Sequence, residues 1–117
     1  MIPTRLHGVI DYLYGLLLLA APFMLGFADG GSAQGVMMAF GAGAILYSLV
    51  TAYELGAVKL IPMPMHLALD VGAGIVLAAS PWLFGFADQI WWPHVLAGGT
   101  SILVPLLTRR RPQQPDR

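Results

Sequence analysis

The chain repeats itself at an offset of 59 residues. Within the window 7–29, ten residues are identical to their counterparts in 66–88, without a gap. Most of these positions are three or four residues apart, which is the spacing of one face of an α-helix. The identities are His7/His66, Asp11/Asp70, Gly15/Gly74, Leu18/Leu77, Ala20/Ala79, Pro22/Pro81, Gly26/Gly85, Phe27/Phe86, Ala28/Ala87 and Asp29/Asp88. We therefore expect two copies of one helical unit that meet the same physical demand on that face.

The composition indicates that the solvent of this chain is a lipid bilayer. Of its 117 residues, 57% are hydrophobic and only 10% are charged, whereas soluble domains carry about 25% charged residues. A soluble protein of this size needs a large polar surface, which so few polar residues cannot supply. The net charge of zero gives no basic face for nucleic acid. The absence of cysteine excludes disulfides, thiolate metal sites and cysteine nucleophiles.

Four apolar segments are long enough to cross a membrane, which takes about 20 residues. They cover about 6–27, 34–53, 65–86 and 91–107. Each copy holds two segments, so both copies enter the membrane in the same direction, related by a pseudo-two-fold axis along the membrane normal. The predicted fold is an all-α, four-helix transmembrane bundle made of two parallel-duplicated helical hairpins. It forms a single integral membrane domain over 1–117, with repeat 1 at about 5–54 and repeat 2 at about 64–111.

The charges between the segments predict an orientation. Arg5, Lys59 and the arginines 109–111 fall on one side, and the turns on the other side carry Asp29 and Asp88. Because basic loops stay inside, we expect a multi-pass protein of the cell (inner) membrane with both termini in the cytoplasm. The two aspartates are expected to be N-caps or turn residues. Aromatic residues near the span ends are predicted to anchor at the interfaces, namely Trp91, Trp92, Tyr12, Tyr14, Tyr47 and Tyr53.

A proline motif closes the first segment of each copy. The second copy reads Ser80-Pro81-Trp82-Leu83-Phe84-Gly85-Phe86, and the first keeps the proline and an aromatic as Ala21-Pro22-Phe23. Each proline removes a backbone donor and frees a carbonyl one turn earlier, which the hydroxyl of Ser80 could satisfy in the second copy. A kink or helix end is expected there, with Phe23 and Trp82 at the outer interface. The residues given this structural role are Pro22, Gly26, Phe27, Ser80, Pro81, Trp82, Gly85 and Phe86.

The Ser-Pro-Trp sequence inside a duplicated two-helix unit resembles the signature of the SPW repeat family. That family consists of small bacterial and archaeal membrane proteins whose repeat contains two transmembrane helices. The resemblance spans nearly the whole chain. It implies the fold and the membrane location, and it implies no established activity.

One polar stripe could carry chemistry. His7 and Asp11 share a helix face, as do His66 and Asp70, and ionised side chains in membrane helices usually face the bundle interior in pairs. The pseudo-two-fold would bring the pairs together if the first and third helices touch, with Gly15 and Gly74 helping them approach. Three hypotheses follow. The pairs satisfy each other as packing contacts, they hold a metal ion or a bis-histidine haem, or they relay protons in a small transporter.

The residues of known catalytic motifs are missing from the sequence. There is no glycine-rich phosphate loop, nucleophile elbow or His-Glu-x-x-His, so we expect no enzyme. The second and fourth segments are rich in small residues over 39–44 and 97–101, which is typical of close helix packing in lipid. The leading hypothesis is a structural or interaction protein without a cofactor, an accessory subunit of a larger membrane complex or a homo-oligomer. Its partners would be lipid and either other membrane subunits or itself.

Overall fold

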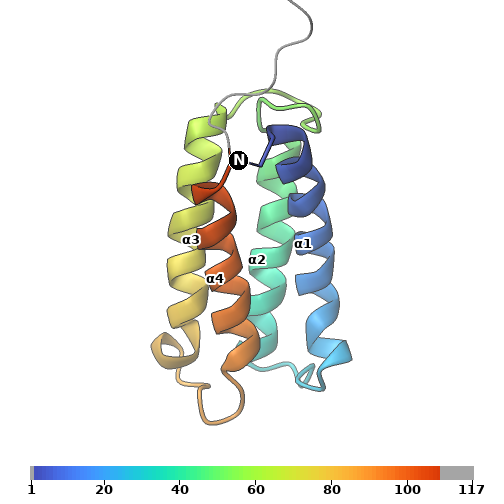
Figure 1. The fold of residues 1–117 in the computed structure, drawn as a ribbon. Helices are drawn as coiled ribbons and strands as arrows, with labels where there is room; N and C mark the ends of the chain where they lie inside the picture. Colours follow the sequence, from blue (N-terminus) through green and yellow to red (C-terminus); the bar gives the residue numbers. More distant parts are fainter. Residues whose placement is uncertain (1, 109–117) are drawn as a thin grey trace, which may run out of the picture.

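The computed structural model describes residues 2–108, which form four helices (Figure 1). They are α1 (Thr4–Met24), α2 (Ser32–Leu49), α3 (Met63–Leu83) and α4 (Trp92–Leu106). Apart from the helices, the described residues hold only two isolated β-bridges. The predicted all-α bundle is thus confirmed. The arginines 109–111 and the predicted end of repeat 2 lie outside the described residues.

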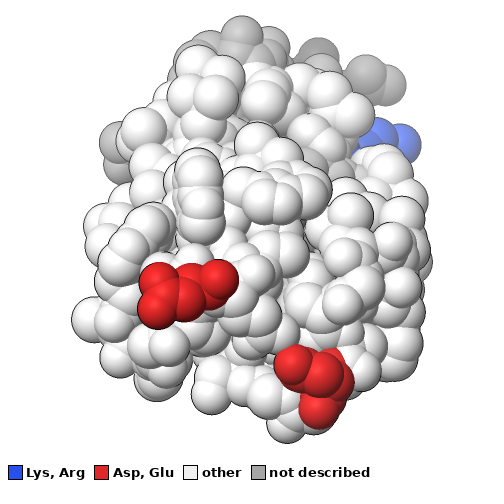
Figure 2. Space-filling view, turned by 90° about the horizontal axis from the view of Figure 1, so that it is seen from below, with Lys and Arg blue, Asp and Glu red and all other residues white. Residues whose placement is uncertain are grey.

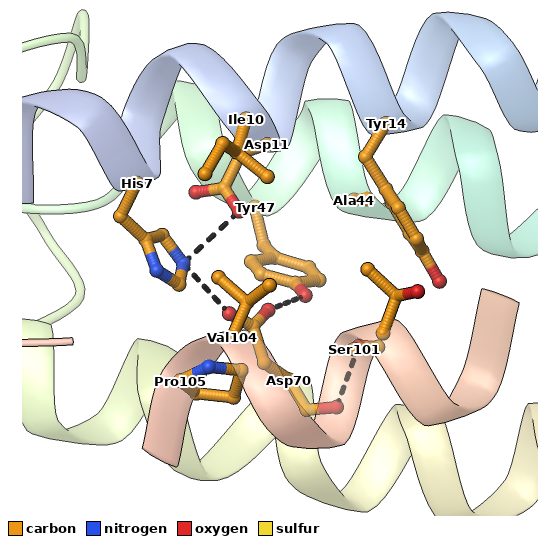
Figure 3. Close-up of a pocket in the computed structure, with 11 residues that line it drawn as sticks. His7, Ile10, Asp11, Tyr14, Ala44, Tyr47, Asp70, Ser101, Val104 and Pro105 are labelled. Atoms are coloured by element: carbon orange, nitrogen blue, oxygen red, sulfur yellow. Dashed lines mark hydrogen bonds and ion pairs between the residues drawn. The ribbon is translucent and has the colours of Figure 1, made fainter. Parts of the chain in front are cut away.

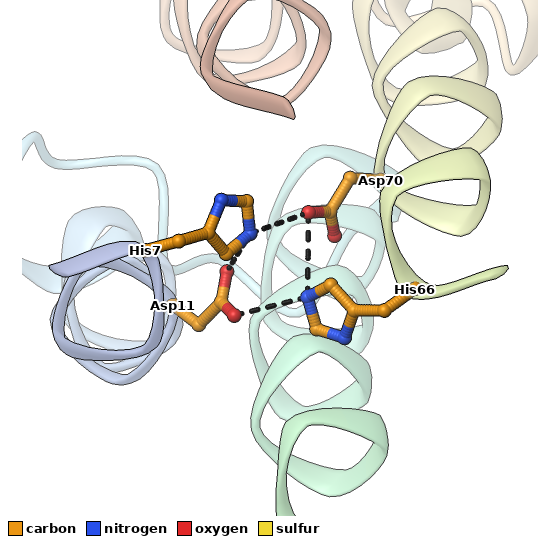
Figure 4. A group of neighbouring side chains, drawn as sticks. All are labelled: His7, Asp11, His66 and Asp70. Carbon is orange, nitrogen blue, oxygen red and sulfur yellow. Dashed lines mark hydrogen bonds and ion pairs between the residues drawn. The ribbon is translucent and has the colours of Figure 1, made fainter. Parts of the chain in front are cut away.

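The bundle is built from two tight hairpins. α1 packs along α2 and α3 along α4, whereas the contacts of α2 with α3 and of α1 with α4 are sparser. A view into the bundle places α1 and α3 diagonally across from each other (Figure 4). The repeated helices are in contact through the side chains of His7, Asp11, His66 and Asp70 in the bundle interior.

Paired glycines hold each hairpin together. A Cβ added to Gly15 would lie 2.9 Å from the carbonyl oxygen of Gly41, and one added to Gly74 would lie 2.6 Å from that of Gly98. Side chains are excluded there because the two backbones of each hairpin touch. The expectation that Gly15 and Gly74 bring the first and third helices together is therefore wrong. They bring each of those helices to its own hairpin partner.

The repeated Gly-Phe dipeptide ends α1 and α3. Gly26 has φ 80°, a left-handed conformation that favours glycine. The backbone N–H of Phe27 then donates to the carbonyl of Pro22 at 2.9 Å, which is the closing hydrogen bond of a Schellman motif. The second copy repeats this arrangement with Gly85 (φ 73°), Phe86 and Pro81. Both helices therefore stop three residues before the predicted positions 27 and 86.

The serine of the Ser-Pro-Trp sequence has the expected partner. The hydroxyl of Ser80 donates to the carbonyl of Leu77 at 2.6 Å, and this is the carbonyl that Pro81 leaves without its helical donor. The aromatic residues after the two prolines point outward, since Phe23 is 63% and Trp82 61% exposed. The motif thus completes a helix end and places an aromatic ring on the outer surface.

α2 ends at Leu49, and the predicted end at 53 is wrong. The linker 50–62 turns back beneath the helix, where the N–H of Ala52 donates to the carbonyl of Ile61 at 2.7 Å. Hydropathy cannot mark this end, because residues 50–53 are as apolar as the helix before them. The linker closes the bundle over one end of its interior.

The outer surface is apolar along the helices. Many large hydrophobic side chains are exposed, including Leu13, Leu46, Ile75 and Leu103. By length and composition, α1, α2 and α3 can each cross a membrane, while α4 has 15 residues. Seen from the end that carries the two short turns, the surface shows two acidic patches and almost no basic charge (Figure 2). These features agree with a membrane protein in contact with lipid.

Candidate functional site: a buried histidine–aspartate quartet

Four polar side chains meet in the bundle interior at the end covered by the linker. His7 and Asp11 come from α1, and His66 and Asp70 come from α3 (Figure 4). Both histidines are 0% exposed, and both aspartates are buried. We call these four residues the His–Asp quartet. It links the two hairpins across the diagonal of the bundle.

Nitrogen and oxygen atoms alternate around the quartet. The Nε2 atom of His7 lies 3.1 Å from Oδ1 of Asp11 and 2.9 Å from Oδ2 of Asp70. The Nε2 atom of His66 lies 2.9 Å from Oδ2 of Asp11 and 3.4 Å from Oδ2 of Asp70. Each histidine therefore contacts the aspartate on its own helix and the one on the opposite helix.

Each member of the quartet also has one hydroxyl partner outside it. The imidazole Nδ1 atoms lie beside threonines, and the carboxylates accept from tyrosines. The four partners are Thr108 for His7 (2.9 Å), Thr51 for His66 (2.7 Å), Tyr53 for Asp11 (2.7 Å) and Tyr47 for Asp70, the last seen in Figure 3. The quartet is therefore held in place from the ends of α2 and α4 and from the linker.

The tyrosines differ from their predicted role. Tyr47 and Tyr53 bond the aspartates, and the hydroxyl of Tyr14 donates to the carbonyl of Ala97 inside the bundle at 2.7 Å. The prediction of interfacial anchors is wrong for these three. Burial, reinforced by the nearby Asp11 charge, raises the pKa of Tyr53 in the linker. Its hydroxyl therefore keeps its proton and donates to Asp11.

The two threonine partners are equivalent residues of the two copies, but the 59-residue repeat does not align them. Thr51 and Thr108 are 57 residues apart, whereas the repeat of the first and third helices has an offset of 59. The same offset of 57 relates Gly41 to Gly98. The second hairpin is thus two residues shorter between its helices. A search allowing this deletion would have aligned the threonines.

The family model of the SPW repeat domain matches residues 5–108. The chain belongs to the SPW repeat family. No curated protein and no solved structure matches it.

In this SPW repeat protein the quartet can balance its charge in two ways. Two aspartates carry two negative charges, which are costly in a membrane interior. Two imidazolium ions or one divalent cation would neutralise them. With two imidazolium ions, the quartet is a cluster of ion pairs that joins the two hairpins. With a divalent cation, it is a metal site.

The other two chemistries fit less well. A haem between the histidines does not fit, because their ring centroids are 5.3 Å apart in edge contact and the cavity beside the quartet holds only about 20 Å³. A proton relay needs polar groups across the membrane. Beyond the quartet, Leu18, Met37 and Leu77 belong to an apolar core cluster, and the hydroxyls of Tyr14 and Ser101 donate to backbone carbonyls.

The remaining polar residues of the sequence lie at that far end. His94 packs between Phe27 and Phe86, with ring centroids 5.5 and 4.7 Å away, and its Nε2 lies 2.9 Å from the carbonyl oxygen of Ala33. Asp29 accepts from the N–H of Gly31 at 2.9 Å and is a turn residue, not the N-cap of α2. These contacts are structural.

A second feature of the SPW fold is an apolar groove on the outer surface between α2 and α3. It has a volume of about 260 Å³. Ala39 and Gly43 line the α2 wall of the groove, and together with Gly35, one turn beyond the groove, they form a stripe of small residues at intervals of four. No described atom lies within 4 Å of a Cβ built on Gly35 or Gly43. The stripe is therefore open to whatever surrounds the bundle.

Proposed function

We propose that this protein is a non-catalytic membrane protein that works by associating with another transmembrane helix, as a homo-oligomer or as an accessory subunit. The supporting observation is the outward stripe of Gly35, Ala39 and Gly43 beside the groove. Helices in lipid associate through close van der Waals approach, which small residues at intervals of four permit. Gly41 and Gly98 each contact a helix of their own hairpin, at Gly15 and Gly74, whereas no described atom lies near Gly35 or Gly43 of this stripe.

The proposal places the protein in the cell (inner) membrane with four crossings. Lys59 and Arg5 lie at the linker end of the bundle, and Asp29 and Asp88 lie in the turns at the other end. The positive-inside rule then puts the linker and both termini in the cytoplasm. α4 has 15 residues, but it packs closely against α3 and is as apolar as the other helices, which supports a fourth crossing.

A substitution in the groove tests the association. Gly43→Leu adds a bulky side chain to the stripe and should raise the dissociation constant between chains at least about 10-fold, a change of about 1.4 kcal/mol. Energy transfer between labelled copies in liposomes measures self-association, and mass spectrometry of native-membrane extracts identifies other subunits. The matched control is Gly99→Leu, because Gly99 on α4 is equally open and lies away from the groove.

The two variants separate the outcomes. Loss of self-association or of a co-purified subunit in Gly43→Leu alone supports the groove as the contact. Equal behaviour of both variants and the original chain would refute it. A chain that is monomeric in liposomes and extracts without any partner would refute the proposed role as a whole.

A further inference from the structure

We propose that the His–Asp quartet binds one divalent first-row transition-metal ion through the Nε2 atoms of His7 and His66 and one carboxylate oxygen each from Asp11 and Asp70. This goes beyond association through the groove and does not depend on it. One ligand atom from each residue lies within 4.8 Å of the other three. The four donors therefore converge on one point from two opposite helices.

An unpartnered nitrogen distinguishes a metal site from a self-satisfied cluster. The Nε2 atom of His66 is fully buried and has no hydrogen-bond partner among the described residues, although Oδ2 of Asp11 lies 2.9 Å away. Two other buried side-chain atoms, Ser48 Oγ and His94 Nδ1, also have no partner, but only His66 Nε2 lies within a group of converging ligand atoms. Buried polar atoms without a partner are rare and call for an explanation. A cation at the centre of the quartet would take up the lone pair of this nitrogen.

The threonines favour the tautomer that a metal requires. The Oγ1 atoms of Thr51 and Thr108 each lie 2.6 Å from the carbonyl oxygen of the residue four positions earlier. A threonine hydroxyl has one hydrogen, and donating it to that carbonyl leaves its oxygen to accept from Nδ1–H of the histidine. If the imidazoles are neutral, their Nε2 lone pairs then face the quartet. Metal-bound histidines almost always donate their other N–H in this way.

The carboxylates are oriented in the same manner. Tyr53 donates to Asp11 and Tyr47 donates to Asp70, and hydrogen bonds to ligating carboxylates are a usual part of metal sites. All four donors thus have an outer hydrogen-bond partner.

Charge and space also fit a divalent ion. Two carboxylates, two neutral imidazoles and one divalent cation sum to zero, which suits an apolar surrounding. With one ligand atom from each residue, the four atoms lie within 4.8 Å of one another, so a tetrahedral ion, whose ligands are roughly 3.3 Å apart at bonds of about 2.0–2.1 Å, would draw the widest pair closer together. The cavity of about 20 Å³ beside His7, Asp11 and Asp70 (Figure 3) has room for a water as a further ligand.

The donor set selects the class of metal. Imidazole nitrogen suits Zn²⁺, Cu²⁺, Fe²⁺ and Ni²⁺, while Ca²⁺ and Mg²⁺ prefer oxygen ligands. The sequence has no cysteine, so a thiolate site of the kind that favours Cu⁺ is absent. The expected ion is therefore a divalent first-row metal such as Zn²⁺ or Fe²⁺.

Cobalt titration tests the proposal with a visible signal. The protein is purified in detergent through a tag without histidine, stripped with a chelator and titrated with Co²⁺. We expect one Co²⁺ per chain, visible bands of a low-symmetry site, and displacement by one equivalent of Zn²⁺. A stripped protein that retains neither Co²⁺ nor Zn²⁺ above the level of the buffer would overturn the proposal.

The third histidine provides a matched control. His66→Gln removes a ligand and should weaken Co²⁺ binding by more than about 100-fold, since loss of an outer partner alone costs 10–100-fold. His94→Gln changes a histidine that is equally buried at the opposite end of the bundle, and it should bind Co²⁺ like the original chain. Equal binding by His66→Gln, or loss confined to His94→Gln, would contradict the assignment.

Two further measurements keep the test decisive if His66→Gln does not fold. The double variant Asp11→Asn, Asp70→Asn keeps acceptors for the two tyrosines and removes both charges, so it should stay helical by circular dichroism and lose Co²⁺. X-ray absorption of the Zn²⁺-loaded original chain should show two imidazoles and two or three oxygens. Retained metal in the helical double variant, or a shell without imidazole, would overturn the proposal.

Discussion

Thr51 and Thr108 each use one side-chain oxygen for two hydrogen bonds. Each hydroxyl lies close to a helix carbonyl and to the Nδ1 atom of a quartet histidine. Both threonines belong to the opposite copy from the histidine that they contact, so Thr108 orients His7 and Thr51 orients His66. At the scale of single residues, the histidine of each copy is therefore positioned by a threonine of the other copy.

Replacing Thr51 with valine tests this role. Thr51→Val keeps the shape and removes the only described partner of the buried Nδ1 of His66, so it should lower the free energy of unfolding by about 1–3 kcal/mol. Thr100→Val is the control, because Thr100 makes the same carbonyl contact, to Leu96, without a histidine. Unfolding monitored by circular dichroism during SDS titration compares them. Equal stabilities would show that the threonine–histidine contact contributes nothing.

The sequence predicts part of this polar centre. The stripe shared by His7, Asp11, His66 and Asp70 indicates that both copies meet one demand, and the structure brings all four side chains together. The tyrosine partners could not be predicted, because they have no counterpart in the other copy, and the threonines align only when a two-residue deletion in the second copy is allowed. Tyr53 in particular lies in a linker whose path depends on backbone contacts with Ile61, which residue pattern alone does not encode.

At the scale of helices, the position of a glycine decides its role. Gly98 faces Gly74 so closely that an added Cβ would lie 2.5 Å from its carbonyl oxygen, whereas no described atom lies within 4 Å of a Cβ on the adjacent Gly99. One residue along the helix thus separates a backbone contact from an open surface. Small-residue content predicts close packing somewhere on the helix but does not identify the face.

The two neighbouring glycines should respond to alanine with opposite signs. Gly98→Ala forces apart two backbones that cannot rotate away, and should destabilise the protein by about 1–3 kcal/mol. Gly99→Ala gains helix propensity of up to about 1 kcal/mol without a clash. The midpoint of SDS-induced unfolding gives both values. A Gly98→Ala protein as stable as Gly99→Ala would contradict the close approach of α3 and α4.

The ends of the helices show which local sequence features predict where a helix stops. Pro22, Gly26 and Phe27 encode the end of α1 through a positive φ and a closing hydrogen bond, and the sequence marks the region correctly to within three residues. The end of α2 has no such signal, since an apolar run continues past Leu49. The diagonal placement of α1 and α3 also could not be deduced, because a row of glycines indicates that another helix packs closely there but not which helix it is.

At the scale of the whole molecule, the two hairpins are related by approximate two-fold symmetry. The bridge of Ile2 with Thr108 corresponds to that of Ile61 with Thr51, and the glycine pair of one hairpin corresponds to that of the other. The axis runs along the bundle, as parallel repeats in a membrane require. The His–Asp quartet lies between the two hairpins, whose other contacts with each other are sparser than the contacts within each hairpin.

The distribution of charge along this axis predicts how the molecule lies in the membrane. Lys59 and Arg5 are at the linker end, and the turns at the opposite end carry only acidic charge. Because the chain has no cysteine, Val58→Cys and Ser32→Cys each introduce a single thiol, one in the linker and one at the start of α2. A membrane-impermeant maleimide should label Val58→Cys only in inverted vesicles and Ser32→Cys only in intact spheroplasts. Labelling of both from the same side would contradict the crossing of α2, and exchanged sides would reverse the proposed orientation while leaving the bundle itself intact.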